Sequence, residues 1–224
     1  MRIGILGTGG VGRTLAAGVA ALGHDVVVGT RDPESTLARS EPDGSGGFAD
    51  WLAQHPEVGL ASMADAAAHG EVVVNATNGA GTLAALQAAG AERLGGKPLL
   101  DVSNPLDFSH GFPPTLTVKD TDSLAETVQR AFPDARVVKS LNTVTAELMV
   151  APERLAAGAH SMFVAGDDPE AKAVVRGLLR ELGWVDVLDL GDLTAARGME
   201  MWLPLWLRLF GTLGTAEFNL SIVR

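Results

Sequence analysis

Three glycines near the start of the chain have the spacing of a loop that could hold a dinucleotide. Gly7, Gly9 and Gly12 lie in the stretch GILGTGGVGRTLAAG, residues 4–18, and form the pattern G-x-G-x-x-G. The first glycine would allow a tight turn, the second a close approach to a pyrophosphate, and the third close packing of the following helix. The free N–H groups at the start of that helix would attract phosphate. The pattern alone is weak, because 27 glycines can match it by accident and a turn without a ligand would also fit.

The sequence GTRDP at residues 29–33 indicates which dinucleotide the loop would bind. Proteins that select NAD usually place an acidic residue here for the ribose 2′-OH, whereas the 2′-phosphate of NADP needs a neutral or cationic group. Thr30 offers a hydroxyl and Arg31 a guanidinium, which suit a phosphate. Asp32 would repel that phosphate, but Pro33 follows directly, so we interpret Asp32 as the N-cap of a helix. These residues favour NADP over NAD.

The alternation of strands and helices predicts the fold that would position these residues. Short apolar or β-branched runs predict strands at residues 2–7, 24–30, 59–62, 71–77, 97–104, 135–143, 161–167 and 184–191. Helices are predicted between most of them, and the very apolar chain from Thr194 onward is expected to be helical. Such units form a parallel sheet covered by helices on both faces. The sequence therefore predicts an α/β fold: a Rossmann-type, doubly wound, mainly parallel sheet with a small helical C-terminal extension.

A domain boundary is expected near Gly158. Residues 1–158 would form an NADP-binding Rossmann domain, and residues 159–224 would complete the sheet and supply a face for substrate or for a dimer partner. Turn residues predict loops at residues 41–48 and 105–117, and the prolines of the second loop exclude a long element there.

An aromatic stripe marks the C-terminal helix. Trp202, Trp206 and Phe210 recur every four residues and would share one helix face. We expect this face to be core or a dimer interface, and it could also form a wall of the pocket for a second ligand. Pro204 is expected to kink the helix.

The composition limits the classes of partner and compartment. The chain has 17 basic and 27 acidic residues, a net charge of -10 and no basic run, which argues against a nucleic-acid partner. It has no cysteine, which excludes thiolate chemistry and disulfides and fits a reducing compartment. No targeting signal is expected, because the first residues lead directly into a predicted strand without a charged leader or a long apolar run. No membrane span is expected, because charges and Pro204 interrupt the most apolar stretch, residues 199–214. We expect a cytoplasmic homodimer with a small-molecule substrate.

Five motifs along nearly the whole chain resemble the F420-dependent NADP oxidoreductase family. They are, in order, GILGTGGVG, VVVGTRDP, LLDVSNPL, FPDARVVKSLNTV and DVLDLGDLTAARGMEMW. The NADPH domain of the STEAP metalloreductases is similar. The resemblance implies that NADP(H) lies along the C-terminal edge of the sheet. It also implies that hydride passes directly between the nicotinamide and a second redox ring, which is coenzyme F420 or a flavin such as FMN or FAD.

The resemblance also implies roles for individual residues. It places Thr8, Gly9, Gly10 and Val11 at the pyrophosphate, Thr30 and Arg31 at the 2′-phosphate, Ala76, Thr77 and Asn78 along the path to the nicotinamide, Asn104 at the nicotinamide ribose, and Asn142 and Ala146 near the carboxamide. Members of the F420 group can carry a lysine four residues after the phosphate-binding arginine. This chain has Ser35 there, so one cation of the 2′-phosphate cradle is missing.

No catalytic residue and no metal site are predicted. Hydride transfer between two bound rings needs alignment more than acid–base help, and no cluster has metal-ligand spacing. A reductase of a small carbonyl or imine is the alternative enzyme and would need a proton donor. The chain has no tyrosine, so Lys139 is the lysine to consider. A non-catalytic NADP-binding sensor that docks a partner is the other alternative.

The histidines and an acidic pair have structural interpretations. His24 and His160 are expected to be structural, and His110 lies in a loop where it could touch the second substrate. Asp167 and Asp168 are interpreted as helix N-terminal residues.

Overall fold

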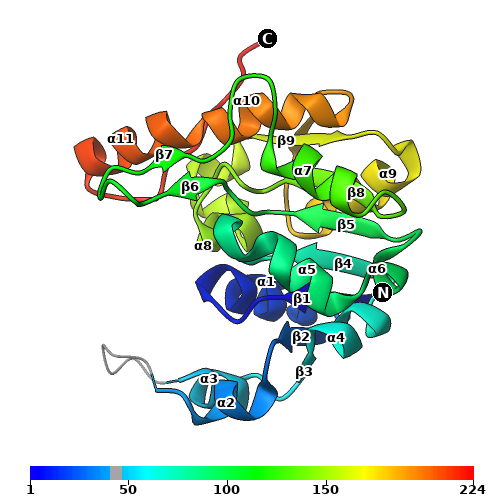
Figure 1. Ribbon diagram of the computed structural model, residues 1–224. Coiled ribbons are helices and arrows are strands. Elements are labelled where there is room, and N and C mark those ends of the chain that lie inside the picture. The colour runs from blue at the N-terminus through cyan, green and yellow to red at the C-terminus, as the bar shows by residue number, and fades with distance from the viewer. Residues whose placement is uncertain (41–46) are drawn as a thin grey trace.

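The computed structural model describes residues 1–40 and 47–224, so most of the loop predicted at residues 41–48 lies outside the described residues. The main sheet of the described chain has eight strands, in the order β10-β9-β8-β5-β4-β1-β2-β3 (Figure 1). Their bounds are β1 (Arg2–Leu6), β2 (Asp25–Thr30), β3 (Val58–Ser62), β4 (Val72–Asn75), β5 (Pro98–Asp101), β8 (Arg136–Ser140), β9 (Ser161–Gly166) and β10 (Asp186–Asp189).

The strands from β3 to β8 are mutually parallel, and the direction changes once. β9 runs antiparallel to β8, and β10 runs parallel to β9. The chain goes from β1 outward to β3 and then returns to β4 on the other side, so the strand order reverses between β1 and β4. In such sheets, ligands bind at this reversal, beyond the carboxyl ends of the strands. The predicted doubly wound, mainly parallel sheet is confirmed.

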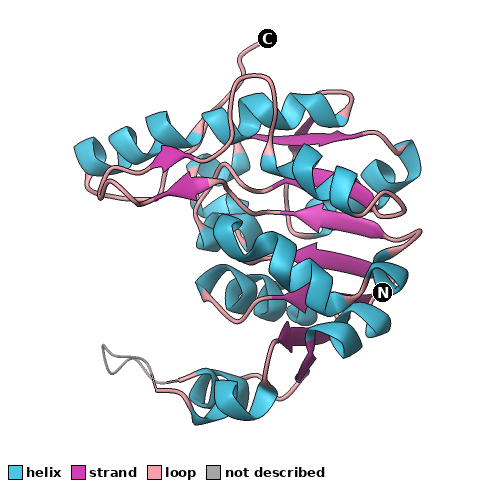
Figure 2. Cartoon of the chain, viewed as in Figure 1, coloured by secondary structure: helices cyan, strands magenta, loops and turns pink. Residues whose placement is uncertain are grey.

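Helices cover both faces of the sheet (Figure 2). One face packs against α1 (Gly10–Ala21), α3 (Phe48–Gln54), α8 (Ala146–Val150) and α9 (Pro169–Glu181). The other packs against α4 (Met63–His69), α5 (Thr82–Ala89), α6 (Ala91–Leu94), α7 (Leu124–Ala131) and α10 (Ala196–Met201). Because side chains alternate along a strand, Ile5 of β1 joins the first core and Leu6 joins the second.

Short elements connect these units. α2 (Pro33–Ala38) follows β2, and single 3-10 turns are η1 (Gly79–Gly81), η2 (Pro152–Arg154), η3 (Ala156–Gly158) and η4 (Leu193–Ala195). The loop predicted at residues 105–117 contains only the two-residue strands β6 (Leu106–Asp107) and β7 (Thr115–Leu116), which pair as an antiparallel ribbon. The absence of a long element from this described segment is as predicted.

The C-terminal segment is helical only in part. The helix is interrupted at Trp202, and α11 (Leu203–Leu213) begins there with Pro204 in its first turn. The sequence predicts a kink at Pro204, and the structure interrupts the helix two residues before it, since proline has no backbone N–H to donate to the preceding turn. The expectation of helix to the chain end is wrong beyond Leu213. Gly214 ends α11 in the left-handed conformation, and the backbone N–H of Ser161 then donates to Leu220 O at 2.9 Å.

None of the helices in the described part of the chain combines the length and the apolarity needed to traverse a bilayer.

Candidate functional site

A cleft runs along the sheet edge where the parallel strands end. It consists of two adjoining hollows of about 460 and 370 Å³, and the walls of both include Gly9, Ala76, Thr77 and Asn78. We call their union the sheet-edge cleft. Its walls contain eleven of the predicted cofactor-binding residues: Gly7, Thr8, Gly9, Gly10, Val11, Thr30, Arg31, Ala76, Thr77, Asn78 and Asn104. Gly12, Ser35, Asn142 and Ala146 are not among the residues that line it.

The three glycines of the motif have different structural requirements. Gly7 has a φ of +120°, a conformation that favours glycine. A Cβ on Gly12 would lie 2.1 Å from the carbonyl oxygen of Gly7, so close packing of α1 against the loop excludes any side chain there. A Cβ on Gly9 would meet no atom within 4 Å, and the same holds for Gly10. Packing therefore does not require glycine at these two positions, and the space beside them belongs to the cleft.

The start of α1 presents backbone N–H donors to this space. Gly9 is the N-cap and has an extended backbone, and no side chain caps the helix. The first helical hydrogen bond runs from the backbone N–H of Arg13 to Gly9 O at 3.0 Å. The preceding N–H groups of the first turn have no partner within the helix, and the positive end of the helix dipole lies there. This arrangement suits a pyrophosphate.

The end of β2 supplies a hydroxyl and a cation. Arg31 lines the cleft, and the Thr30 hydroxyl lies 2.8 Å from that of Thr36. Asp32 caps α2, because its carboxylate accepts the backbone N–H of Ser35 at 3.0 Å and the Ser35 hydroxyl at 2.7 Å. The backbone N–H of Ser35 holds the pKa of Asp32 below its usual value. The interpretation of Asp32 as an N-cap is confirmed, and both polar groups of Ser35 are directed to that cap.

Arg39 is a cleft residue that the sequence did not reveal. It lies just beyond α2 and lines the same hollow as Thr30 and Arg31. Within residues 1–40 and 47–224, neither guanidinium has an ion pair or a hydrogen bond. Position 35 carries a serine rather than a cation, and Arg39, four residues further along the chain, brings a second guanidinium to this hollow. No motif marks such a position, because it depends on how α2 turns back toward the cleft.

A hydrogen-bonded network supports the middle of the cleft. The Thr77 hydroxyl donates to Asn75 Oδ1 at 2.6 Å, and Asn75 Nδ2 donates to the buried carboxylate of Asp101 at 2.7 Å. Asn78 Oδ1 accepts the backbone N–H of Gly81 at 2.7 Å and so caps η1. These side chains position the loop after β4, and the backbone of that loop forms the cleft wall.

Two asparagines from neighbouring strands join at the far end of the cleft. Asn104 Nδ2 donates to Asn142 O, and Asn142 Nδ2 donates to Asn104 Oδ1, both at 2.9 Å. Asn142 Nδ2 also donates to Met199 O of α10 at 3.0 Å, so two acceptors decide the orientation of this amide. Asn142 Oδ1 is buried and has no hydrogen-bond partner among the described residues. An unpaired buried acceptor is costly unless a donor reaches it.

Lys139, the lysine considered for carbonyl reduction, is engaged elsewhere. Its side chain is 0% exposed, and Nζ lies 2.8 Å from Asp101 Oδ2 and 2.9 Å from Glu200 Oε1. It also donates to Ser103 O at 2.5 Å. Burial lowers its pKa, but the two carboxylates more than offset this, so the pKa lies above the ordinary lysine value. A buried ammonium held by three acceptors is poorly placed to protonate a substrate in the cleft.

The other polar candidates have structural partners or lie apart. His160 is buried and contacts Pro152 O through Nε2 at 2.8 Å, and His24 lies 2.9 Å from Glu181, so the structural interpretation of both is supported.

The acidic pair and the loop histidine also lie outside the cleft. Asp168 caps α9, as predicted. Asp167 instead accepts the backbone N–H of Leu193 at 2.9 Å. His110 is exposed in the loop before β7 and does not line the cleft.

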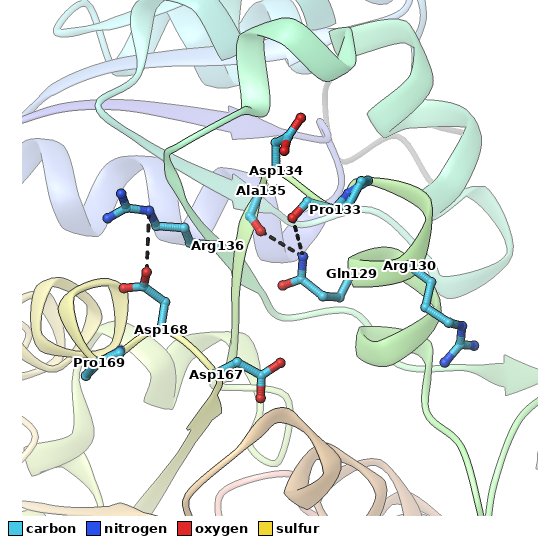
Figure 3. A pocket seen from close by; sticks show the side chains of 9 residues that line it. All are labelled: Gln129, Arg130, Pro133, Asp134, Ala135, Arg136, Asp167, Asp168 and Pro169. Atoms are coloured by element: carbon cyan, nitrogen blue, oxygen red, sulfur yellow. Dashed lines mark hydrogen bonds and ion pairs between the residues drawn. The ribbon is translucent and has the colours of Figure 1, made fainter.

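A separate hollow of about 510 Å³ lies beside the first residues of β8 and the start of α9 (Figure 3). Its polar side chains are largely paired. Gln129 donates to Ala135 O at 2.8 Å and accepts the backbone N–H of Val137. Arg136 pairs with Asp168 at 3.5 Å, and Arg130 pairs with Asp122 at 2.6 Å. We therefore interpret the polar side chains around this hollow as structural. The hollow lies at the opposite ends of the parallel strands from the sheet-edge cleft.

Comparisons with known proteins agree with this geometry. The family model described as "NADP oxidoreductase coenzyme F420-dependent" matches residues 2–105. An F420-dependent NADP reductase of Methanocaldococcus jannaschii is 30% identical over 215 residues, which cover 93% of this chain and 92% of that protein. The chain belongs to the F420-dependent NADP oxidoreductase family. It is accordingly an NADP-dependent oxidoreductase, and the resemblance of its five motifs is confirmed.

Two further relatives of this oxidoreductase are informative. A crystal structure from Arthrobacter sp. FB24, described as that of an F420-dependent NADP reductase, matches the whole chain with a TM-score of 0.96 and 60% identity, and the match covers 100% of both chains. Metalloreductase STEAP3 of Rattus norvegicus is 32% identical over 211 residues, which cover 92% of this chain and 38% of that protein. The oxidoreductase thus spans less than two fifths of the length of this metalloreductase.

Proposed function

We propose that this oxidoreductase binds NADP(H) along the sheet-edge cleft and transfers hydride between it and coenzyme F420, or a flavin, as second substrate. The observation that carries the proposal is the order of groups along one cleft. Two arginines without a partner among the described residues lie at one end, and an open glycine turn lies in the middle. Behind the other end lies an amide oxygen to which no described residue donates. This order matches the 2′-phosphate, the pyrophosphate and the carboxamide of NADP(H). The bound nicotinamide supplies or accepts the hydride.

The proposed roles of the residues follow from their atoms. The N–H groups at the start of α1, residues 10–12, bind the pyrophosphate. Arg31 and Arg39 bind the 2′-phosphate, to which each can present several N–H donors. Asn142 Oδ1 accepts a carboxamide N–H after a small movement, and Asn104 holds Asn142 in place. Ser35 and Gly12 act indirectly by shaping the loops, and Ala146 begins the helix that follows Asn142.

A planar second substrate fits the surroundings of Asn104. The cleft continues there along Leu106 and Phe108, and Phe108 is 59% exposed. An exposed aromatic side chain beside a polar cleft is suited to stack on a flat ring. The described residues that line this hollow include no Asp, Glu, His, Lys, Arg or Tyr. A reaction between two aligned rings needs none, whereas carbonyl reduction needs a proton donor.

Loss of either cleft arginine is expected to weaken NADPH binding selectively. Arg31→Ala or Arg39→Ala should each raise the Kd for NADPH by about tenfold, since a charge-assisted hydrogen bond contributes about 1.5–3 kcal/mol. The Kd for NADH should change by less than about twofold, because NADH has no 2′-phosphate. Titration calorimetry with both nucleotides measures the difference. Equal losses for NADPH and NADH would contradict the assignment of these residues to the 2′-phosphate.

The second substrate is tested by stopped-flow absorbance. The protein is mixed with NADPH and, in separate reactions, with oxidised F420, FMN or FAD. We expect rapid bleaching of F420. Bleaching of a flavin alone would make the protein a flavin reductase. Tight NADPH binding without reduction of any ring would contradict hydride transfer to a ring and favour the sensor alternative.

We also propose a homodimer that uses α11. Leu205 and Leu213 on this helix are 53% and 54% exposed, and Phe210 is 39% exposed. Large apolar side chains clustered on one exposed helix are typical of an interaction surface. Light scattering of the purified protein tests the proposal, and a monomer at micromolar concentration would contradict it.

A further inference from the structure

A groove of about 420 Å³ lies between the β6–β7 ribbon and the start of α11, and the function proposed above does not use it. Figure 1 shows the ribbon beside α11. Pro113 and Pro114 form part of one wall, and Met201 and Pro204 form part of the other. Two cations, Lys119 and Arg208, also line the groove. The groove is therefore an apolar channel with positive charge from two separate segments of the chain.

Among the described residues, these two cations have no ion-pair partner, whereas several other cations of the chain do. In a chain of net charge -10, Arg130 pairs with Asp122 at 2.6 Å and Arg197 pairs with Glu126 at 2.5 Å. Across residues 1–40 and 47–224, no carboxylate pairs with the side chain of Lys119 or Arg208, and the groove lining contains no Asp or Glu. Two like charges at one groove repel each other, so a bound anion would relieve an unfavourable interaction as well as form two favourable ones.

The groove adjoins the end of the cleft where the second substrate is proposed to bind. Leu106 of β6 lines the cleft, and it pairs directly with Leu116 of β7, which lines the groove. Paired strands lie about 4.8 Å apart, so cleft and groove meet the ribbon at neighbouring positions. α10 provides a second connection, because Met199 O holds Asn142 and Met201 lines the groove.

We propose that Lys119 and Arg208 bind the anionic side chain of the second redox substrate while its ring lies in the cleft against Leu106 and Phe108. This inference rests on the proposed function and specifies its substrate class: a redox ring with a phosphate or carboxylate on its side chain. The bare ring fits the cleft equally well but lacks the contact with the groove. The two cations therefore select between substrates that share one ring.

The inference is tested by comparing acceptors that differ only in the side chain. The double variant Lys119→Ala/Arg208→Ala is assayed with NADPH and either FMN or riboflavin, and with F420 or its deazaflavin ring lacking the anionic side chain. We expect kcat/KM for FMN and F420 to fall by about tenfold or more, mainly through KM, because the charged contacts are lost. For the two acceptors without an anionic group, the change should be less than about twofold. Raising the salt concentration should reduce the preference of the unmodified protein for anionic acceptors.

Two further variants separate charge from structure. Arg180→Ala removes an exposed cation on α9, away from the groove, and should leave every ratio unchanged. Lys119→Arg/Arg208→Lys keeps both charges and should retain most of the preference. Lys119 and Arg208 are both exposed, so the thermal unfolding of the variants at these two positions is expected to match that of the unmodified protein.

The outcomes distinguish this inference from the function on which it rests. If the unmodified protein reduces none of the four acceptors, the proposed function is wrong and the inference falls with it. If the unmodified protein reduces them but the alanine variant loses the same factor with and without the anionic group, only the assignment of the groove is overturned. A selective loss for the anionic acceptors in the alanine variant, together with a preference that the charge-preserving variant retains, supports both.

Discussion

Gly9→Val is expected to abolish binding of both NADPH and NADH while the protein stays folded. The Cβ at this position meets no atom within 4 Å, and the φ of -73° is available to any residue. The added side chain therefore occupies the cleft in front of the first turn of α1, where the pyrophosphate is proposed to bind. We expect the Kd for both nucleotides to rise by at least about 100-fold, which corresponds to about 2.7 kcal/mol. The free energy of unfolding should fall by no more than about 1 kcal/mol, because valine is a poorer N-cap than glycine.

Gly12→Ala provides the contrasting result. Its Cβ would lie 2.1 Å from Gly7 O, which is backbone and cannot move aside cheaply. We expect Gly12→Ala to lower the free energy of unfolding by about 1–3 kcal/mol, and any loss of nucleotide binding would result from this destabilisation. Gly177→Ala in the interior of α9 adds a methyl group in open space, so it should leave nucleotide binding unchanged and raise the stability by about 0.5–1 kcal/mol, because alanine is the better helix former. Urea unfolding and nucleotide titration of the three variants separate the roles. NADPH binding by Gly9→Val within about tenfold of normal would show that the glycine turn is not the binding site.

Local patterns in the sequence predicted most of the framework. The Asp32–Pro33 and Asp168–Pro169 pairs each predicted a helix start, and both aspartates cap their helices. The glycine spacing predicted a turn between β1 and α1, where Gly7 and Gly12 are required by conformation and by packing. These signals are readable because the cause and the effect lie within a few residues of each other.

The parts that were not predicted depend on contacts between distant segments. Arg39 reaches the cleft because of the path of the chain after α2, which no local pattern specifies. The antiparallel direction of β9 against β8 was not predicted, because β9 lies inside the sheet and is buried along nearly its whole length, so its sequence is an apolar run like those of the parallel strands. The sequence left Lys139 as a possible proton donor, because its ion-pair partners Asp101 and Glu200 lie on other elements and no local pattern links them to it.

Lys139→Met is expected to destabilise the protein by about 3–5 kcal/mol, because the change leaves Asp101 and Glu200 buried without their shared cation. Glu200 also accepts the backbone N–H groups of Leu124 and Ala125 at 2.8 and 3.1 Å, so the ion cluster joins α10 to the start of α7. Urea unfolding measures the loss. Adding Asp101→Asn and Glu200→Gln to Lys139→Met removes the uncompensated charge and should recover about 2 kcal/mol or more. Unfolding of Lys139→Met at the normal urea concentration would contradict a stabilising role for the cluster.

The pH dependence of this loss has a definite sign. The pKa of Lys139 in the folded protein is raised above the ordinary value of 10.5, because the two carboxylates outweigh its burial. A raised lysine pKa contributes stability that is fully present below the unfolded-state pKa and is lost as the pH rises through the folded-state pKa. The difference in unfolding free energy between the unmodified protein and Lys139→Met should therefore stay constant from neutral pH to about pH 10 and become smaller only above 10.5. A difference that already becomes smaller between pH 7 and pH 9 would mean that the lysine loses its proton more easily than its two carboxylate partners allow.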